Sequence, residues 1–264
     1  MFADLISLCT AAALPALPQN WWAVWSFAPA ALLPLLVLLG HAAAPSRITG
    51  LDAGAARRWR TGGVALLAVA LVSPLCRLAA TLAWAHMAQL MVMVAACALL
   101  ALGWRRTAGT SGTASRPALA AATFCHGALL WLWHVPVVYE AVLTHSALHV
   151  AAYALLIGSA FWFWREVLRA QQAHVGAALL AVLATMAHTG LLGALLTFAG
   201  TPLYALQAPG ARAWGLDPLQ DQQLAGLLMW VPGGLAYLLA ALGLAFAVAR
   251  GSHRSMRGIP SGAD

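Results

Sequence analysis

The sequence is poor in charge. Charged residues make up 8% of its 264 residues, whereas a soluble domain usually has about 25%. Lysine is absent, so all 14 basic residues are arginine, a bias from which we draw no function. Because 62% of the residues are hydrophobic, this scarcity of charge excludes an ordinary soluble domain.

Several signatures of catalysis and of nucleic-acid binding are also absent. The sequence has no Gly-rich phosphate loop, no HExxH, no GxSxG and no serine-triad pattern. No basic patch is interleaved with exposed aromatic residues, so the net charge of +7 does not indicate a nucleic-acid partner. We therefore expect a protein that is not an enzyme and does not bind nucleic acid.

Cysteine is scarce and unpatterned. The four cysteines, Cys9, Cys76, Cys97 and Cys125, form no CxxC pair, and the last two fall inside apolar runs. A disulfide framework is therefore not expected. The first 21 residues lack the basic leader of a signal peptide and carry Asp4 instead. We expect residues 1–21 to be an uncleaved external segment.

Long apolar runs are what the sequence does contain. Several approach or exceed ~18 residues, the length that argues for a membrane span, and none alternates with a period of two. The predicted fold class is all-α, a polytopic membrane protein with a seven-transmembrane helix bundle at 22–250 and a disordered polar tail at 251–264. The expected spans are 22–40, 62–80, 84–103, 118–135, 147–164, 175–199 and 222–249.

Arginine is distributed unevenly between the two sets of predicted loops. Twelve arginines fall on one side, including Arg165 and Arg169, and the connector at 107–115 on that side is Gly/Ser/Thr-rich and predicted to be flexible. The positive-inside rule then puts the N-terminus outside and the C-terminus in the cytoplasm. The other side holds two arginines and four acids: Arg77, Arg212, Asp4, Glu140, Asp217 and Asp221.

Histidines gather at the predicted outer ends of three spans. The stretch 130–149 contains no Lys or Arg and is predicted to be a short loop between two helices. His86 begins the third span, His134 ends the fourth and His149 opens the fifth, so all three should reach the same depth. Imidazole is the commonest metal-ligating side chain. A metal site and an interfacial hydrogen-bonding role both remain open.

Two further residues could extend this set. Met87 adjoins His86, and a thioether with imidazoles suits Cu(I) better than Mg²⁺ or Ca²⁺, although methionine is also ordinary apolar filling. His145 shares a helix face with His149 if that helix begins early enough. Asp221, at the outer start of the seventh span, is expected to stabilise that helix N-terminus. Copper is the metal that these residues predict.

Two histidines are expected near mid-membrane, where polar groups are expensive and functional by default. His126 lies eight residues before His134 and could be a deeper metal ligand. A neutral histidine bonded to a neighbouring helix is the alternative. Together with His188 it could also supply the two axial ligands of a haem.

Six features resemble the multi-span CtaG family, the assembly factors of caa3-type cytochrome c oxidase. They are SPL at 73–75, HM at 86–87, WHVPVVYEAVL at 133–143, His149 with FWFW at 161–164, GLLGALLTFAGTPLY at 190–204 and DQQLAGLLMWVPGG at 221–234. The resemblance implies seven helices, a role in copper acquisition by the oxidase, and an oxidase subunit or a copper chaperone as partner. The family often carries a second histidine four residues after the first, where this chain has Leu90 and Tyr153.

Three other functions remain compatible with the sequence. The protein could be a scaffold that docks oxidase subunits through its helix faces, with histidines that only satisfy hydrogen bonds. It could be a haem-binding or electron-transfer protein that uses His126 and His188. It could also be a copper transporter, since soft residues occur at both depths.

Overall fold

The computed structural model describes residues 8–11, 14–44, 51–104 and 115–257. These residues form helices and no strand, which confirms the predicted all-α class. The elements are η1 (Trp21–Ala23), α2 (Pro29–Ala43), α3 (Leu51–Val72), α4 (Pro74–Thr81), α5 (Ala83–Gly103), α6 (Arg116–His134), α7 (Pro136–Thr144), α8 (Ser146–Ala173), α9 (Val175–Thr197), α10 (Ala208–Ala213) and α11 (Pro218–Arg257).

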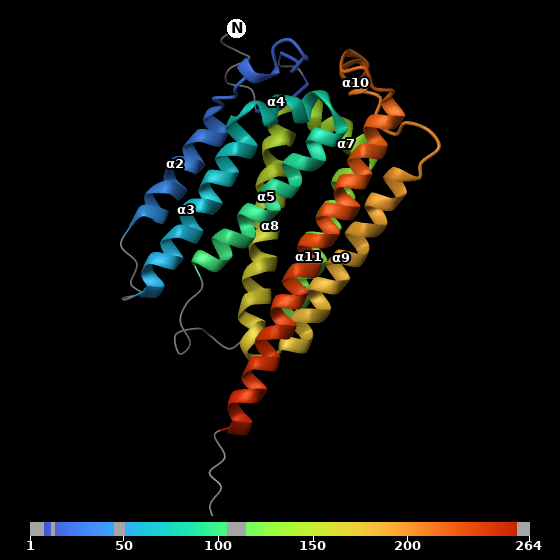
Figure 1. The fold of residues 1–264 in the computed structure, drawn as a ribbon. Coiled ribbons are helices and arrows are strands. Elements are labelled where there is room, and N and C mark those ends of the chain that lie inside the picture. The colour runs from blue at the N-terminus through green and yellow to red at the C-terminus, as the bar shows by residue number, and fades with distance from the viewer. Residues whose placement is uncertain (1–7, 12–13, 45–50, 105–114, 258–264) are drawn as a thin grey trace, which may run out of the picture.

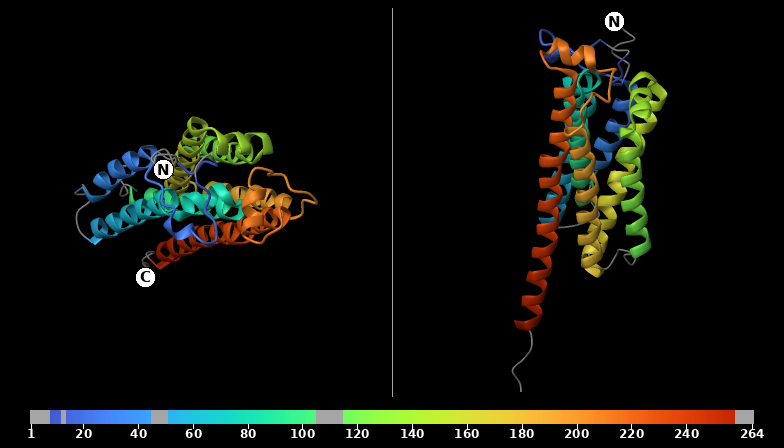
Figure 2. Two further views of the ribbon diagram at one scale, coloured as in Figure 1. Left: turned by 90° about the horizontal axis from the view of Figure 1, so that it is seen from above. Right: turned by 90° about the vertical axis from the view of Figure 1, so that its right-hand side faces the viewer.

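The long helices lie side by side in one bundle, and the short helices gather at one end of it. Figure 1 shows α4, α7 and α10 at the same end as the N-terminal segment. We call this the capped end. At the opposite end α11 extends beyond the other helices (Figure 2).

Membrane-spanning helices are confirmed, but their number is not. Within the described part of the chain, α5, α8, α9 and α11 are each long and apolar enough to cross a membrane. The count rises to six if α3 with α4, bent by 50°, and α6 with α7, bent by 81°, each form one span. Helix α2 has 15 residues and is shorter than a span. The seven-span count and the orientation stay predictions.

The stretch 130–149 is not the loop that the sequence suggested. Helix α6 ends at His134, α7 follows almost at once, and α8 begins at Ser146. Pro136 lacks a backbone N–H and restricts the residue before it, and Val135 accordingly leaves the helical conformation at φ −62° and ψ 124°. The prolyl break turns the chain and leaves His134 at the end of α6.

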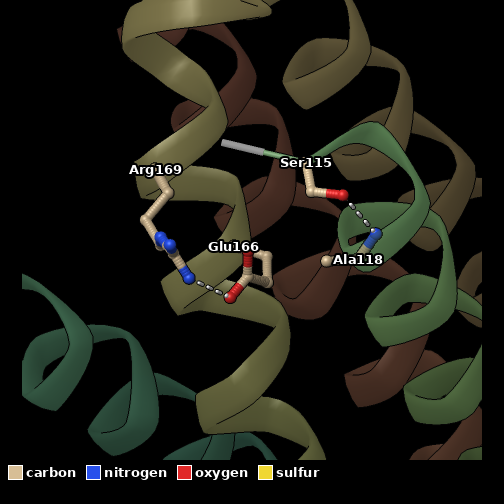
Figure 3. A network of polar contacts seen from close by, with 4 residues as sticks. All are labelled: Ser115, Ala118, Glu166 and Arg169. Carbon is tan, nitrogen blue, oxygen red and sulfur yellow. Dashed lines mark hydrogen bonds and ion pairs between the residues drawn. The ribbon is translucent and has the colours of Figure 1, made fainter. Parts of the chain in front are cut away.

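Helices α8 and α11 extend further than predicted at the end opposite the capped end. Arg165 and Arg169, expected in a loop, lie inside α8, where Arg169 pairs with Glu166 at 3.0 Å (Figure 3). Helix α11 continues to Arg257, through part of the tail expected to be disordered. The connector predicted at 107–115 lies outside the described residues except for Ser115, whose hydroxyl caps α6 by accepting from the Ala118 N–H (Figure 3).

A disulfide joins Cys9 to Cys76 of α4, so the expectation of no disulfide is wrong. The N-terminal segment folds back over the capped end, which brings together two cysteines that are 67 residues apart. Further along this segment the Ala16 N–H donates to Thr81, and its carbonyl accepts from the Trp214 indole. The disulfide and these hydrogen bonds attach the segment to α4 and to the end of α10.

Helices α9 and α11 approach closely at two glycines. A Cβ on Gly226 would lie 2.5 Å from the Gly193 carbonyl oxygen, and one on Gly193 would lie 2.8 Å from the Gly226 oxygen. Small residues allow membrane helices to pack backbone to backbone. This contact fixes α11 against the bundle.

Replacement of Gly226 by alanine should therefore separate α9 from α11. We expect Gly226→Ala to lower the free energy of unfolding by about 1–3 kcal/mol, since overpacking forces the backbones apart. The matched control is Gly243→Ala in the same helix, where no described atom lies within 4 Å of the added Cβ. Thermal unfolding in detergent measures both, and equal stabilities would contradict the contact.

Loss of the disulfide should also destabilise the protein. The chain-entropy model assigns about 4 kcal/mol to a crosslink that closes a loop of this length. We expect Cys9→Ala and Cys76→Ala to lower unfolding stability, whereas Cys125→Ala, a free cysteine, should not. Alkylation and mass spectrometry give a direct check: labelling of Cys9 before any reductant is added would show that the bond is not formed.

Candidate metal centre

The three outer histidines lie together at the capped end. His86 is in the first turn of α5, His134 is the last residue of α6, and His149 is in the first turn of α8. All three side chains are buried. His86 lies within electrostatic range of both other rings. Three elements distant in sequence thus bring three imidazoles into one region.

Two of the three rings are anchored through one nitrogen to the backbone. His134 Nδ1 lies 2.6 Å from the Leu130 carbonyl oxygen, and His149 Nδ1 lies 3.1 Å from that of Val142. The His86 ring lies near the backbone of Ala79. A carbonyl can only accept, so the anchored nitrogen carries the proton and the other nitrogen of a neutral ring carries a lone pair.

The remaining ring nitrogens have no proton donor to pair with. His134 Nε2 faces the sulfur of Met87 at 3.2 Å, and a thioether has no hydrogen to donate. His149 Nε2 and His86 Nδ1 are buried without a hydrogen-bond partner among the described residues. Leaving a buried polar atom unpaired costs about 1–3 kcal/mol. The region therefore holds three imidazole lone pairs and a thioether sulfur that could be ligands.

Tyrosine side chains lie beside these imidazole rings. They were not among the site residues predicted from the sequence. The chain has four tyrosines, and Tyr139, Tyr153 and Tyr204 all lie here. The ring of His149 lies 4.1 Å from that of Tyr153, and the ring of His86 lies 5.0 Å from that of Tyr139. The rarity of tyrosine in this sequence was the signal that could have identified them.

Two glutamines connect the tyrosines to the backbone around the site. Gln207 accepts from the Tyr139 hydroxyl at 2.8 Å and donates to the Ala79 carbonyl. Gln89 accepts from the Tyr153 hydroxyl at 2.6 Å and donates to the Ala70 carbonyl. These bonds hold the aromatic rings in place beside the imidazoles.

Tyr204 fastens the segment between α9 and α10 over the site. Its hydroxyl donates to the carbonyl of His134 at 3.1 Å, which satisfies a carbonyl left free at the end of α6. Its ring stacks on that of Tyr139 with centroids 4.0 Å apart. Burial raises the pKa of Tyr204, so the phenol remains a proton donor at neutral pH.

His145 does not belong to this group. Helix α8 begins at Ser146, so the condition for His145 to share a face with His149 is not met. Its side chain is exposed and its Nδ1 lies 3.0 Å from the Ala141 carbonyl oxygen, within its own turn of chain. It is the exposed neighbour of a buried site.

Asp221 caps a different helix from the one expected. It does lie in the first turn of α11, but its carboxylate accepts from the backbone N–H groups of Ala83 and Trp84 at 2.8 and 3.1 Å. The acid thus stabilises the N-terminus of α5, three residues before His86. Its role is to position the helix that carries a candidate ligand.

His126 lies apart from the outer group, at mid-length in α6. Eight residues separate it from His134, about 12 Å along the helix axis. Its Nδ1 contacts the Ser159 hydroxyl at 3.1 Å. The structure therefore does not bring all the predicted metal ligands together.

The donor set at the capped end is mixed. In the described ranges, no group of three or more His, Cys, Asp and Glu side chains is arranged to hold a metal ion. A site at the capped end would therefore depend on the thioether of Met87 as well as on the imidazoles. His134 Nε2 and Met87 Sδ, 3.2 Å apart, are a pair of potential ligands in contact there.

Comparison with known proteins supplies the family. The family model described as cytochrome c oxidase caa3 assembly factor matches residues 38–251. The match covers all three outer histidines, Met87 and His126. No curated protein and no solved structure matches the chain. The match includes most of the sequence and confirms the resemblance: the chain belongs to the cytochrome c oxidase caa3 assembly factors.

Proposed function

We propose that this protein is a non-enzymatic assembly factor that takes up Cu(I) at its capped end and passes it to a cytochrome c oxidase subunit. Its family supports a role in oxidase assembly. The observation that carries the metal proposal is the contact between His134 Nε2 and Met87 Sδ at 3.2 Å. Two electron-pair donors face each other there without a proton between them, an arrangement that a shared cation would stabilise.

The chemistry of the donors favours Cu(I) over other ions. Thioether and imidazole are soft or borderline ligands, whereas Mg²⁺ and Ca²⁺ take oxygen ligands. The Met87 thioether and the three imidazoles carry no charge, so these ligands would leave the charge of a buried ion uncompensated. Burial of charge is costly, which favours a monovalent ion. The same uncompensated charge favours release of the ion to a recipient site with anionic ligands.

The disulfide supports an outward-facing capped end. Structural disulfides form in oxidising compartments and are rare in the cytosol, and Cys9–Cys76 lies at the end that carries the histidines. The excess of arginine on the opposite loops points the same way. We therefore propose a bacterial inner-membrane protein whose copper site lies at its outer end.

Removal of the donors should weaken Cu(I) binding at the capped end. We expect His86→Ala, His134→Ala, His149→Ala and Met87→Leu each to lower affinity there by at least tenfold, about 1.4 kcal/mol. The matched control is His145→Ala, because this exposed histidine lies close by in sequence but outside the group. Competition with a chromophoric Cu(I) chelator measures the affinity. Undiminished binding in all four variants would reject the site.

A second experiment separates copper delivery from scaffolding. Deletion of the gene should lower both oxidase activity and the copper content of the oxidase, and added copper should restore both. A scaffold would leave the oxidase defect uncorrected by copper, and a variant lacking His86, His134 and His149 would then still support assembly. Oxidase activity and metal analysis of the same membranes provide the readout.

A further inference from the structure

We infer that His126 of α6 and His188 of α9 form a second Cu(I) site, deeper in the bundle than the capped end. This site goes beyond the proposed function and does not depend on the outer donors. It follows from the hydrogen bonds around His126, from ring nitrogens of His188 that have no hydrogen-bond partner among the described residues, and from a glycine that makes room between the two helices.

Ser159 fixes the protonation of His126. The Ser159 hydroxyl donates to the Leu156 carbonyl at 3.1 Å and also lies 3.1 Å from His126 Nδ1. Because a hydroxyl has one proton, both contacts are satisfied when Nδ1–H donates to the serine oxygen. His126 Nε2 then carries a lone pair. It is buried and has no hydrogen-bond partner in the described part of the chain.

His188 of α9 packs against α6 at Gly127, the residue after His126. Both of its ring nitrogens are buried and lack a hydrogen-bond partner in the described ranges, although the side chain is partly exposed. It lies within electrostatic range of His126. A Cβ on Gly127, the residue after His126, would lie 3.0 Å from His188 Nε2. Glycine at this position lets the His188 ring pack directly on α6.

Three unpaired ring nitrogens inside a membrane bundle are costly, and a bound cation would satisfy two of them. Cu(I) is stable with two ligands, whereas protein-bound zinc is almost always four-coordinate. No third His, Cys, Asp or Glu completes a metal-holding group here among the described residues. The Phe163 ring stacks on His126 with centroids 5.6 Å apart and covers one face of that imidazole. A monovalent soft ion fits these constraints.

Haem fits the same residues poorly. Two axial histidines must stand on opposite faces of a porphyrin. The close approach of His188 to Gly127 leaves no width for such a ring between α6 and α9 at this level. The geometry therefore favours a single ion held directly between the two side chains.

The test is the stoichiometry of Cu(I) binding to the full-length protein in detergent, measured anaerobically against a chromophoric chelator. The wild type should bind two equivalents, and His126→Leu and His188→Leu should each bind one. His134→Ala with Met87→Leu should lose the other equivalent and retain this one. The matched control, His41→Leu, replaces an exposed histidine bonded within its own helix and should bind two.

A second variant, Ser159→Ala, distinguishes loss of the metal site from misfolding. It keeps both imidazoles but removes the group that fixes the His126 tautomer, and loss of such an outer partner weakens metal binding about 10–100-fold. We expect that loss at the deep site alone, with the capped-end equivalent unchanged as an internal measure of folding. Copper binding that is the same in the wild type, His126→Leu and His188→Leu, whether at one equivalent or two, would overturn the proposal. A single wild-type equivalent that both of these variants lose would instead reject the capped-end site and leave this one. A Soret band that requires both histidines would also overturn the proposal.

Discussion

The contact between the His134 imidazole and the Met87 thioether places two electron-pair donors 3.2 Å apart inside an apolar bundle. Much of the surrounding structure maintains it. The prolyl break after α6 makes His134 the last residue of its helix. Asp221 caps α5 and thereby positions Met87. Tyr204 holds the end of α6 through the carbonyl of His134. His134 Nδ1 donates its proton to a backbone carbonyl. The Nε2 atom of the neutral ring, which faces the sulfur, therefore carries no proton.

The capped end excludes water from these donors. The N-terminal segment crosses it, held by the Cys9–Cys76 disulfide and by hydrogen bonds to α4 and to Trp214. Gln89 donates to both the Cys9 sulfur and the Ala70 carbonyl while it accepts from Tyr153. The covering segment and the aromatic wall of the site are therefore one hydrogen-bonded unit.

The helical class and the positions of residues at helix ends could be predicted from the sequence. Contacts between residues far apart in the chain could not. The family and the helical class follow from the apolar runs and their motifs. The gathering of the outer histidines follows because successive spans alternate in direction. Cys9 pairs with Cys76 only because the N-terminal segment folds back, which no local pattern encodes. His145 lies outside the group of buried histidines because α8 begins one residue after it. Sequence patterns do not locate the start of a helix to within a residue or two. Asp221 was assigned to its own helix because its true partners lie 137 and 138 residues away.

The central claim is that Met87 and the anchored imidazoles of the capped end together bind Cu(I). Copper-edge X-ray absorption of the Cu(I)-loaded protein tests it most directly. The account predicts a sulfur neighbour in addition to nitrogen neighbours, with the sulfur contribution lost in Met87→Leu and nitrogen retained. A spectrum with nitrogen or oxygen neighbours alone, unchanged by Met87→Leu, would contradict it.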